Sequence, residues 1–463
     1  MNSASIDLSR VSSDGKLTRF HLYLLLLTSL LTLLDGYDIT AISFAAPELA
    51  KAWSIADKSA FSPVFASSLV GILIGAPLFG WFGDRYGRKP AVIVSCLIFG
   101  SLTLGMTVAT SLDQLVILRL ITGIGLGGLL PNASALNVEY APARYRATMI
   151  IIMYIGTALG GAIPGAIAAL LVPHHGWQIL FLIGGILPII GAAAIWLWLP
   201  ESARYLAIKK QRNDEAVRSL NSPKAAQSSP SSQDSFAVNG KKPSSSVSFR
   251  MLFKDGLKMA TPLLWLLFIA NLMGYFFLMS WTPLLLAGSN VSIAKAAIAL
   301  SIFQLGGIAG GLCIARPLDK WGPVPVIVFF IAAVPVIGSI GFVGSAGSEL
   351  LLMLIIFFGG FFTLGIQLGL NAMSVMIYPT IVRSYGAGWA LGIGRLGSIL
   401  GPVLGGLLIA ANLSIKSLYL VGAIPFAVGA IGAIALGVVS KRQFDGRILA
   451  DADTASNNQA SAG

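Results

Sequence analysis

Twelve apolar runs, each long enough to cross a bilayer, follow one another along the chain. A helix needs about 20 predominantly apolar residues to cross a hydrocarbon core roughly 30 Å thick. Lipid offers no hydrogen-bond partners to the backbone, so these runs must be helical, and we expect an all-α integral membrane protein. The expected spans are residues 20–47, 61–83, 90–110, 113–139, 147–171, 177–199, 260–287, 295–315, 323–345, 350–377, 384–411 and 416–439.

The charged residues predict the orientation of these spans. Charged residues make up 11% of the chain, whereas a soluble domain carries about 25%. Of the 31 basic residues, 25 lie in the two tails and in the loops that share a side of the membrane with the N-terminal tail. The loops on the opposite side hold four lysines. Because basic loops stay in the cytoplasm, we expect a multi-pass protein with both termini inside. The net charge of +12 then reflects topology, and no nucleic-acid partner is expected.

A polar, Ser-rich stretch divides the twelve spans into six and six, and it is typical of a flexible linker. The loop GDRYGRKP after the second span has a weaker counterpart, LDKWGP, after the eighth. Such matched positions indicate a parallel repeat, hence two six-helix bundles. The expected division is a cytoplasmic tail 1–19, a first bundle 20–200, a cytoplasmic linker 201–258, a second bundle 259–440 and a cytoplasmic tail 441–463.

Two acids, Asp35 and Asp38, stand in the middle of the first run. A carboxylate at bilayer depth costs on the order of 3 kcal/mol, so the pair must face water, a cation or a proton. They lie about 60° apart around a helix, and Gly36 leaves room beside them. Repulsion and burial disfavour two charges there, so at least one acid should take up a proton readily. We expect a proton-coupling pair; a structural pair neutralised by a fixed arginine is the alternative.

Two arginines also lie inside spans. Arg119 lies roughly 9 Å and Asp38 roughly 13 Å below the outer ends of their spans, so we expect Arg119 to pair with the acids and tune them. Arg395 lies roughly 16 Å from the inner end of its span, near the midplane. The neighbouring spans carry no acid, so a carboxylate brought from outside is the expected partner of Arg395. Capping by carbonyls or by an acid of the first half is the alternative.

The loop GDRYGRKP resembles the signature that members of the major facilitator superfamily carry between their second and third spans. In this loop Asp84 can accept hydrogen bonds and pair with an arginine, while Arg85 and Arg88 can hold an inner gate. PESARYL, after the sixth span, resembles a further element of the superfamily. The remaining gating candidates lie in loops that match between the two halves. Asp319 follows the eighth span, as Asp84 follows the second, and Arg383 follows the tenth span, as Glu139 and Arg144 follow the fourth.

Within the superfamily, three stretches are similar to the aromatic acid:H+ symporter family of bacterial plasma membranes. They are DGYD in the first span, RLITGIGLGGLLPN in the fourth and GIGRLGSILGP in the eleventh. This resemblance implies the major facilitator fold, uptake of benzoate-like or hydroxylated aromatic carboxylates with protons as coupling ion, and a place in the bacterial inner membrane. Polar side chains at helical spacing offer a lining for such a substrate. They are Asn271, Tyr275, Gln304, Gln367 and Asn371.

Two alternatives remain at this stage, a proton-driven exporter of drugs or aromatic compounds and a membrane sensor that does not transport. The chain shows no metal cluster, no nucleophile with its base and no phosphate-binding loop, so neither an enzyme nor ATP as a driving force is expected. We expect a monomer in contact with membrane lipid, with no cofactor beyond protons.

Overall fold

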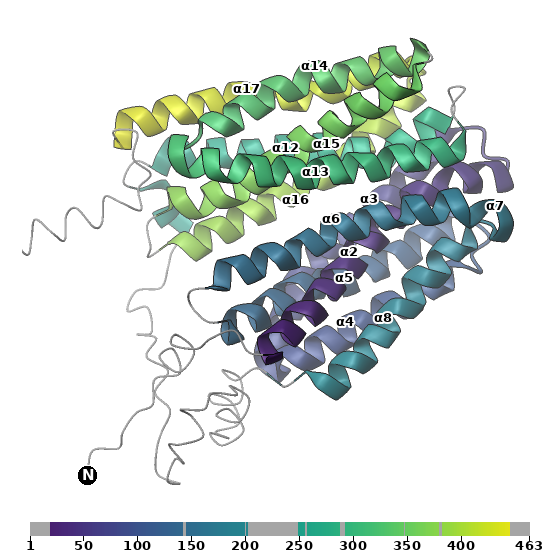
Figure 1. Cartoon of the computed structure of the whole chain (residues 1–463), viewed down its shortest axis with the longest axis horizontal. Coiled ribbons are helices and arrows are strands. Elements are labelled where there is room, and N and C mark those ends of the chain that lie inside the picture. Colours follow the sequence, from purple (N-terminus) through teal and green to yellow (C-terminus); the bar gives the residue numbers. More distant parts are fainter. Residues whose placement is uncertain are drawn as a thin grey trace, which may run out of the picture. The chain divides into compact units, whose positions relative to one another are not determined.

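The computed structural model describes residues 19–141, 145–199, 201, 249–254, 257–287, 292–346, 348–378 and 382–444 (Figure 1). All regular elements in these residues are helices. Twelve of the helices are long and apolar enough to cross a membrane, which confirms the expected fold class. The predicted gating residue Arg144 and both expected tails up to residue 18 and from residue 445 lie outside the described residues.

The first six long helices are α2 (Arg19–Ala52), α3 (Ser62–Tyr86), α4 (Arg88–Met106), α5 (Leu112–Tyr140), α6 (Arg146–Leu170) and α8 (Gln178–Trp198). Two short elements stand between them, η1 (Lys58–Phe61) and α7 (Val172–His175). The helix α2 continues past Pro47 to Ala52, five residues beyond the expected span, and carries Pro47 inside it.

The second six long helices are α12 (Leu257–Ala287), α13 (Ile293–Trp321), α14 (Val324–Ala346), α15 (Glu349–Ile377), α16 (Arg383–Ala410) and α17 (Ile415–Phe444). The short helix η3 (Phe249–Phe253) lies inside the range expected to be a linker. Its Phe249 and Phe253 pack against Trp265 of α12, which ties this end of the linker range to the helix that follows.

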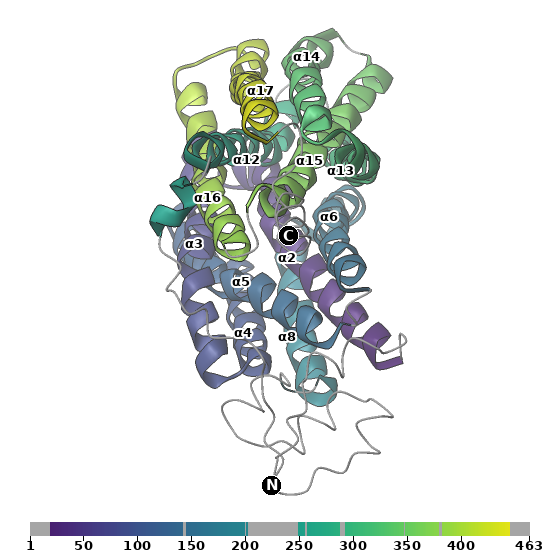
Figure 2. The same cartoon turned by 90° about the vertical axis from the view of Figure 1, so that its left-hand side faces the viewer.

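The chain forms two compact units. One unit holds residues 1–39, 70–161 and 178–244, and the other holds residues 40–69, 162–177 and 245–463, so the division passes through α2, α3 and α6. Within the second unit, α14 and α17 lie side by side in both views, and α12 packs along α16 (Figure 2).

Glycines set how closely neighbouring helices approach. A Cβ atom on Gly36 of α2 would lie 1.9 Å from the carbonyl oxygen of Thr157 on α6, and one on Gly160 would lie 1.9 Å from that of Leu33. The space beside Gly36 is therefore filled by the backbone of α6. This contact holds the acid-bearing part of α2 in place, as close helix approach through small residues does in membranes generally.

Candidate functional site

An ion pair lies in the interior of the first unit. Nη1 of Arg119, on α5, lies 3.2 Å from Oδ2 of Asp38, on α2. The same Nη1 donates to the Asp38 carbonyl oxygen over 3.0 Å. Each of the two residues is 1% exposed. An isolated charge at such a depth is costly, so each side chain supplies the compensation that the other needs.

Two further hydrogen bonds hold Asp38 and its neighbour in α2 in place. The hydroxyl of Thr103, on α4, donates to Oδ1 of Asp38 over 2.8 Å. The phenol of the preceding residue, Tyr37, donates to the Leu180 carbonyl on α8 over 2.9 Å. Asp35 lies one turn earlier on α2 and is also buried. The structure thus brings Asp38 and Arg119 together and keeps Asp35 in the same buried stretch of helix; the predicted role in proton coupling stays a prediction.

The five predicted lining residues form two groups in the second unit. On α12 and α15, Nδ2 of Asn271 donates to Oε1 of Gln367 over 2.9 Å, and Nε2 of Gln367 donates to Oδ1 of Asn371 over 3.2 Å. One turn along α12, the Tyr275 hydroxyl donates to Oε1 of Gln304, on α13, over 3.3 Å. Asn271 and Gln304 are buried, whereas Gln367 and Asn371 are half-buried.

Arg395 lies midway along α16 and is half-buried. Its carbonyl accepts a hydrogen bond from the Ser398 hydroxyl, but no described residue forms a hydrogen bond or ion pair with its guanidinium. On either side of it, Gly394 packs against Phe268 and Gly397 against Ile269, both on α12. Arg395 therefore lies near the level of Asn271 along the α12–α16 pair, and its predicted role as the partner of a carboxylate stays a prediction.

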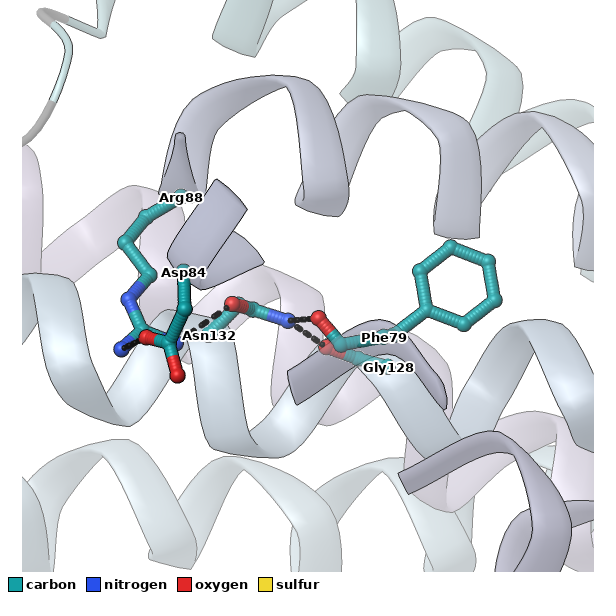
Figure 3. A network of polar contacts seen from close by, with 5 residues as sticks. All are labelled: Phe79, Asp84, Arg88, Gly128 and Asn132. Atoms are coloured by element: carbon teal, nitrogen blue, oxygen red, sulfur yellow. Dashed lines mark hydrogen bonds and ion pairs between the residues drawn. The ribbon is translucent and has the colours of Figure 1, made fainter. Parts of the chain in front are cut away.

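The expected gate loop is short, because only Gly87 separates α3 from α4. Asp84 and Arg88 form an ion pair across this turn, with side chains 69% and 21% exposed respectively. Figure 3 shows that Arg88 also donates to Oδ1 of Asn132, on α5, over 3.0 Å. Nδ2 of Asn132 donates in turn to the carbonyls of Phe79 and Gly128 over 3.2 and 2.8 Å (Figure 3). Asn132 was not among the predicted gating residues, although an amide in the inner part of an apolar run was the available signal.

Glu201, three residues beyond the end of α8, also contacts this turn. Oε1 of Glu201 accepts from the backbone N–H of Lys89 over 3.1 Å, which caps the start of α4, and Nζ of Lys89 donates to the Trp196 carbonyl over 2.8 Å. Gly87 has a φ of +112°, a backbone conformation that favours glycine, and a Cβ atom there would displace the Glu201 carboxylate, whose Oε2 would lie 2.2 Å away. Glu201 is the second contact that was not predicted.

The other gating candidates are placed less fully. Arg85 stacks on the rings of Trp81 and Tyr86, with centroid distances of 5.5 and 5.7 Å. Glu139 is half-buried near the end of α5. Asp319 lies in α13 and Arg383 begins α16, but their side chains are outside the described part of the structure. Among the described residues no group of His, Cys, Asp and Glu could hold a metal ion.

Comparison with known proteins establishes the family. The family model of the Major Facilitator Superfamily matches residues 28–348, which is more than half of the chain. The chain belongs to the Major Facilitator Superfamily. As a superfamily member it is a transporter, not an enzyme.

Several relatives within the superfamily match nearly the whole chain. The 4-hydroxybenzoate transporter PcaK of Pseudomonas putida is 34% identical over 438 residues, covering 94% of this chain and 97% of that protein. The gallate transporter of Pseudomonas putida is 33% identical over 440 residues, covering 94% of this chain and 96% of that protein. These relatives confirm the resemblance to the aromatic acid:H+ symporter family.

A solved structure shows the same superfamily fold. The xylose transporter XylE of E. coli, in a partially occluded inward open conformation, matches 92% of this chain and 98% of its own with a TM-score of 0.69. At 17% sequence identity this similarity concerns the fold alone.

The contacts in Figure 3 predict that two substitutions near the turn between α3 and α4 differ in their cost to stability. Asn132 is fully buried and makes three hydrogen bonds, so Asn132→Leu is expected to cost about 2 to 4 kcal/mol. Asp84→Asn removes an exposed ion pair and is expected to cost about 1 kcal/mol or less. The apparent Tm of the purified full-length protein in detergent should therefore fall further for Asn132→Leu than for Asp84→Asn. Equal shifts for the two variants would contradict it.

Proposed function

We propose that this transporter imports an aromatic carboxylate together with protons by alternating access. The observation that carries the proposal is Arg395, a half-buried guanidinium midway along α16 for which no described residue supplies an anion. A guanidinium binds both oxygens of a carboxylate through parallel N–H donors, and this geometry suits a benzoate-like anion. Relatives that transport 4-hydroxybenzoate and gallate support the same substrate class.

The proposed proton carriers are Asp35 and Asp38, with Arg119 as their fixed partner. Protonation of Asp38 would remove one half of the buried ion pair with Arg119, so the proton changes which contacts within the first unit are favourable. A carrier needs such a change, because a proton that altered no contact could not bias one conformation over another. The turn around Asp84 and Arg88 is the proposed inner gate.

The membrane potential gives the physical reason for proton coupling. An interior potential of −100 mV opposes entry of a monovalent anion by about 2.3 kcal/mol, which alone would hold its internal concentration about 50-fold below the external one. Accumulation therefore requires coupling to an ion gradient, and in this proposal protons move inward with the anion.

Location and assembly belong to the same proposal. The twelve apolar helices and the transporter relatives make the chain a multi-pass membrane protein. We place it in the bacterial inner membrane with both termini in the cytoplasm, because the basic residues gather in the segments that would then be internal. It would act there as a monomer surrounded by lipid, with protons as coupling ion and no cofactor.

Uptake of radiolabelled 4-hydroxybenzoate into cells that express the full chain tests the proposal. Benzoate, gallate, protocatechuate and glucose serve as competitors, and the assay is run with and without a protonophore. We expect uptake that the protonophore abolishes and that the aromatic acids, but not glucose, inhibit. External substrate should also make the medium more alkaline. Acidification of the medium or efflux from preloaded cells would instead identify a proton-driven exporter.

A further inference from the structure

The short helix η3 is held firmly against the start of α12. The Thr261 hydroxyl of α12 donates to the Leu252 carbonyl of η3 over 2.6 Å, and the Leu252 side chain is buried. Phe253 packs edge-on against Trp265 of α12 with a centroid distance of 5.7 Å. The helix η3 is therefore a fixed part of the fold at the end of α12 that enters the membrane.

Aromatic rings extend this contact to α16. Trp389 of α16 packs edge-on against Phe249 of η3 at a centroid distance of 4.9 Å, and it stacks on Trp265 at 6.2 Å. Tyr385, one turn earlier on α16, packs edge-on against Trp389 at 6.3 Å. Two of these rings remain open to the surroundings, since Phe249 is 41% exposed and Trp389 is 37% exposed. Open aromatic rings at the end of a membrane-spanning helix are typical of the boundary between hydrocarbon and headgroups.

Basic side chains accompany these open rings. Arg250 and Lys254, in and directly after η3, and Lys258, at the start of α12, are all exposed. Within the described part of the chain, no residue forms an ion pair with any of them. In residues 240–260 the sequence holds five basic residues and one acid, Asp255, which lies outside the described residues. This end of α12 therefore combines exposed rings with a net positive charge.

The end of α17 adds a further cation at the same depth. The helices α12 and α17 run in opposite directions, because Gly422 of α17 lies against Phe277 of α12 and the later Gly432 lies against the earlier Leu266. Lys441 follows Gly432 by nine residues, and the start of α12 precedes Leu266 by the same number. Each residue of a helix adds about 1.5 Å along its axis, so exposed Lys441 lies near the level of the start of α12.

The position of these groups selects the anion. Rings at the boundary contact the upper part of lipid chains, and cations beside them meet the headgroups. A phosphate diester accepts charge-assisted hydrogen bonds from guanidinium and ammonium groups, and an anionic phospholipid supplies both the phosphate and the chains. A zwitterionic lipid carries a cation of its own next to the phosphate, which the basic side chains repel. Clusters of about four to eight basic residues beside a membrane helix are typical of sites for anionic lipid.

We propose that this end of α12 binds the headgroup of an anionic phospholipid. The binding patch consists of Phe249, Arg250, Lys254, Lys258 and Trp389. The bound lipid stabilises the contact between η3, α12 and α16, because a ligand that binds the folded protein but not the unfolded chain favours folding by mass action. The inference concerns neither the substrate nor the proton, so it goes beyond the proposed function and does not depend on it.

The test measures the apparent Tm of the purified full chain in mixed micelles of a neutral detergent and one lipid. The lipids are palmitoyl-oleoyl phosphatidylglycerol and the phosphatidylcholine with the same acyl chains. The anionic lipid should raise the Tm at a lower mole fraction than the zwitterionic one. The patch variant, with Arg250→Gln, Lys254→Gln and Lys258→Gln, should need about 100-fold more phosphatidylglycerol for the same shift, since each basic residue contributes about fivefold in affinity for an anionic surface. Inorganic phosphate, which has no acyl chains, should leave the Tm unchanged.

The matched control removes three exposed lysines outside the patch, with Lys51→Gln, Lys295→Gln and Lys416→Gln, and should respond to phosphatidylglycerol as the unchanged protein does. Equal stabilisation by the two lipids, an unchanged response of the patch variant, or an equal loss in the control overturns the inference. A Tm shift by inorganic phosphate as large as that by phosphatidylglycerol overturns the lipid as occupant. If the patch variant is not folded by gel filtration, the double variant Lys254→Gln with Lys258→Gln gives the same comparison, with a loss of about 25-fold expected.

Discussion

Replacing Asp38 by asparagine is expected to abolish accumulation of substrate. The amide cannot take up and release a proton, so the uptake that remains runs only down the gradient of the anion. At −100 mV the internal concentration should then fall from above the external one to about 50-fold below it. The Thr103 hydroxyl can still donate to the side-chain oxygen, and Arg119 keeps its bond to the backbone carbonyl of residue 38.

A matched substitution separates proton coupling from a general effect of charge. Asp113 is exposed in the first turn of α5, and Asp113→Asn should leave accumulation unchanged. Because Asp38→Asn leaves Arg119 buried without its anion, the double variant Asp38→Asn with Arg119→Gln restores charge balance and reports on folding. Both Asp38 variants should fail to accumulate radiolabelled 4-hydroxybenzoate. Full accumulation by either one would remove Asp38 from the proton path.

Replacing Arg395 by glutamine is expected to weaken substrate binding by about 100-fold, since two charge-assisted hydrogen bonds of roughly 1.5 kcal/mol each would be lost. Arg395→Lys keeps the charge but not the planar pair of donors, so a smaller loss of about tenfold is expected. Isothermal titration of the purified full chain with 4-hydroxybenzoate measures both. No described residue depends on this guanidinium for a hydrogen bond, so both variants should fold.

The control for Arg395 is Arg19→Gln, at the exposed start of α2, which should bind substrate as the unchanged protein does. An Arg395→Gln variant that keeps full affinity would show that the carboxylate lies elsewhere. Affinity lost equally in Arg395→Lys and Arg395→Gln would contradict the smaller loss expected for lysine and would show that the positive charge alone does not contribute to binding.

The spans and one buried contact could be predicted from the sequence. The cost of placing a residue in lipid is nearly independent of its distant neighbours, so the positions of twelve helices follow from local hydrophobicity. The positions of Asp38 and Arg119 along their spans predicted similar depths in the membrane, and in the structure the two residues form an ion pair. For Asn271, Gln367 and Asn371 the four-residue spacing indicated a shared face but not the bonding partner of each amide.

Only the tertiary structure decided the contacts that depend on how one helix is rotated and shifted against another. Local sequence does not determine that rotation, so neither the bond from Arg88 to Asn132 nor the capping of α4 by Glu201 could be found beforehand. The sequence also could not show that Oδ1 of Asn271 is buried and accepts no hydrogen bond from a described residue, because the partners of a buried acceptor depend on every helix packed around it. Hydrophobicity along the chain therefore determined that this protein crosses a membrane twelve times, and helix packing decided which of its few polar groups meet.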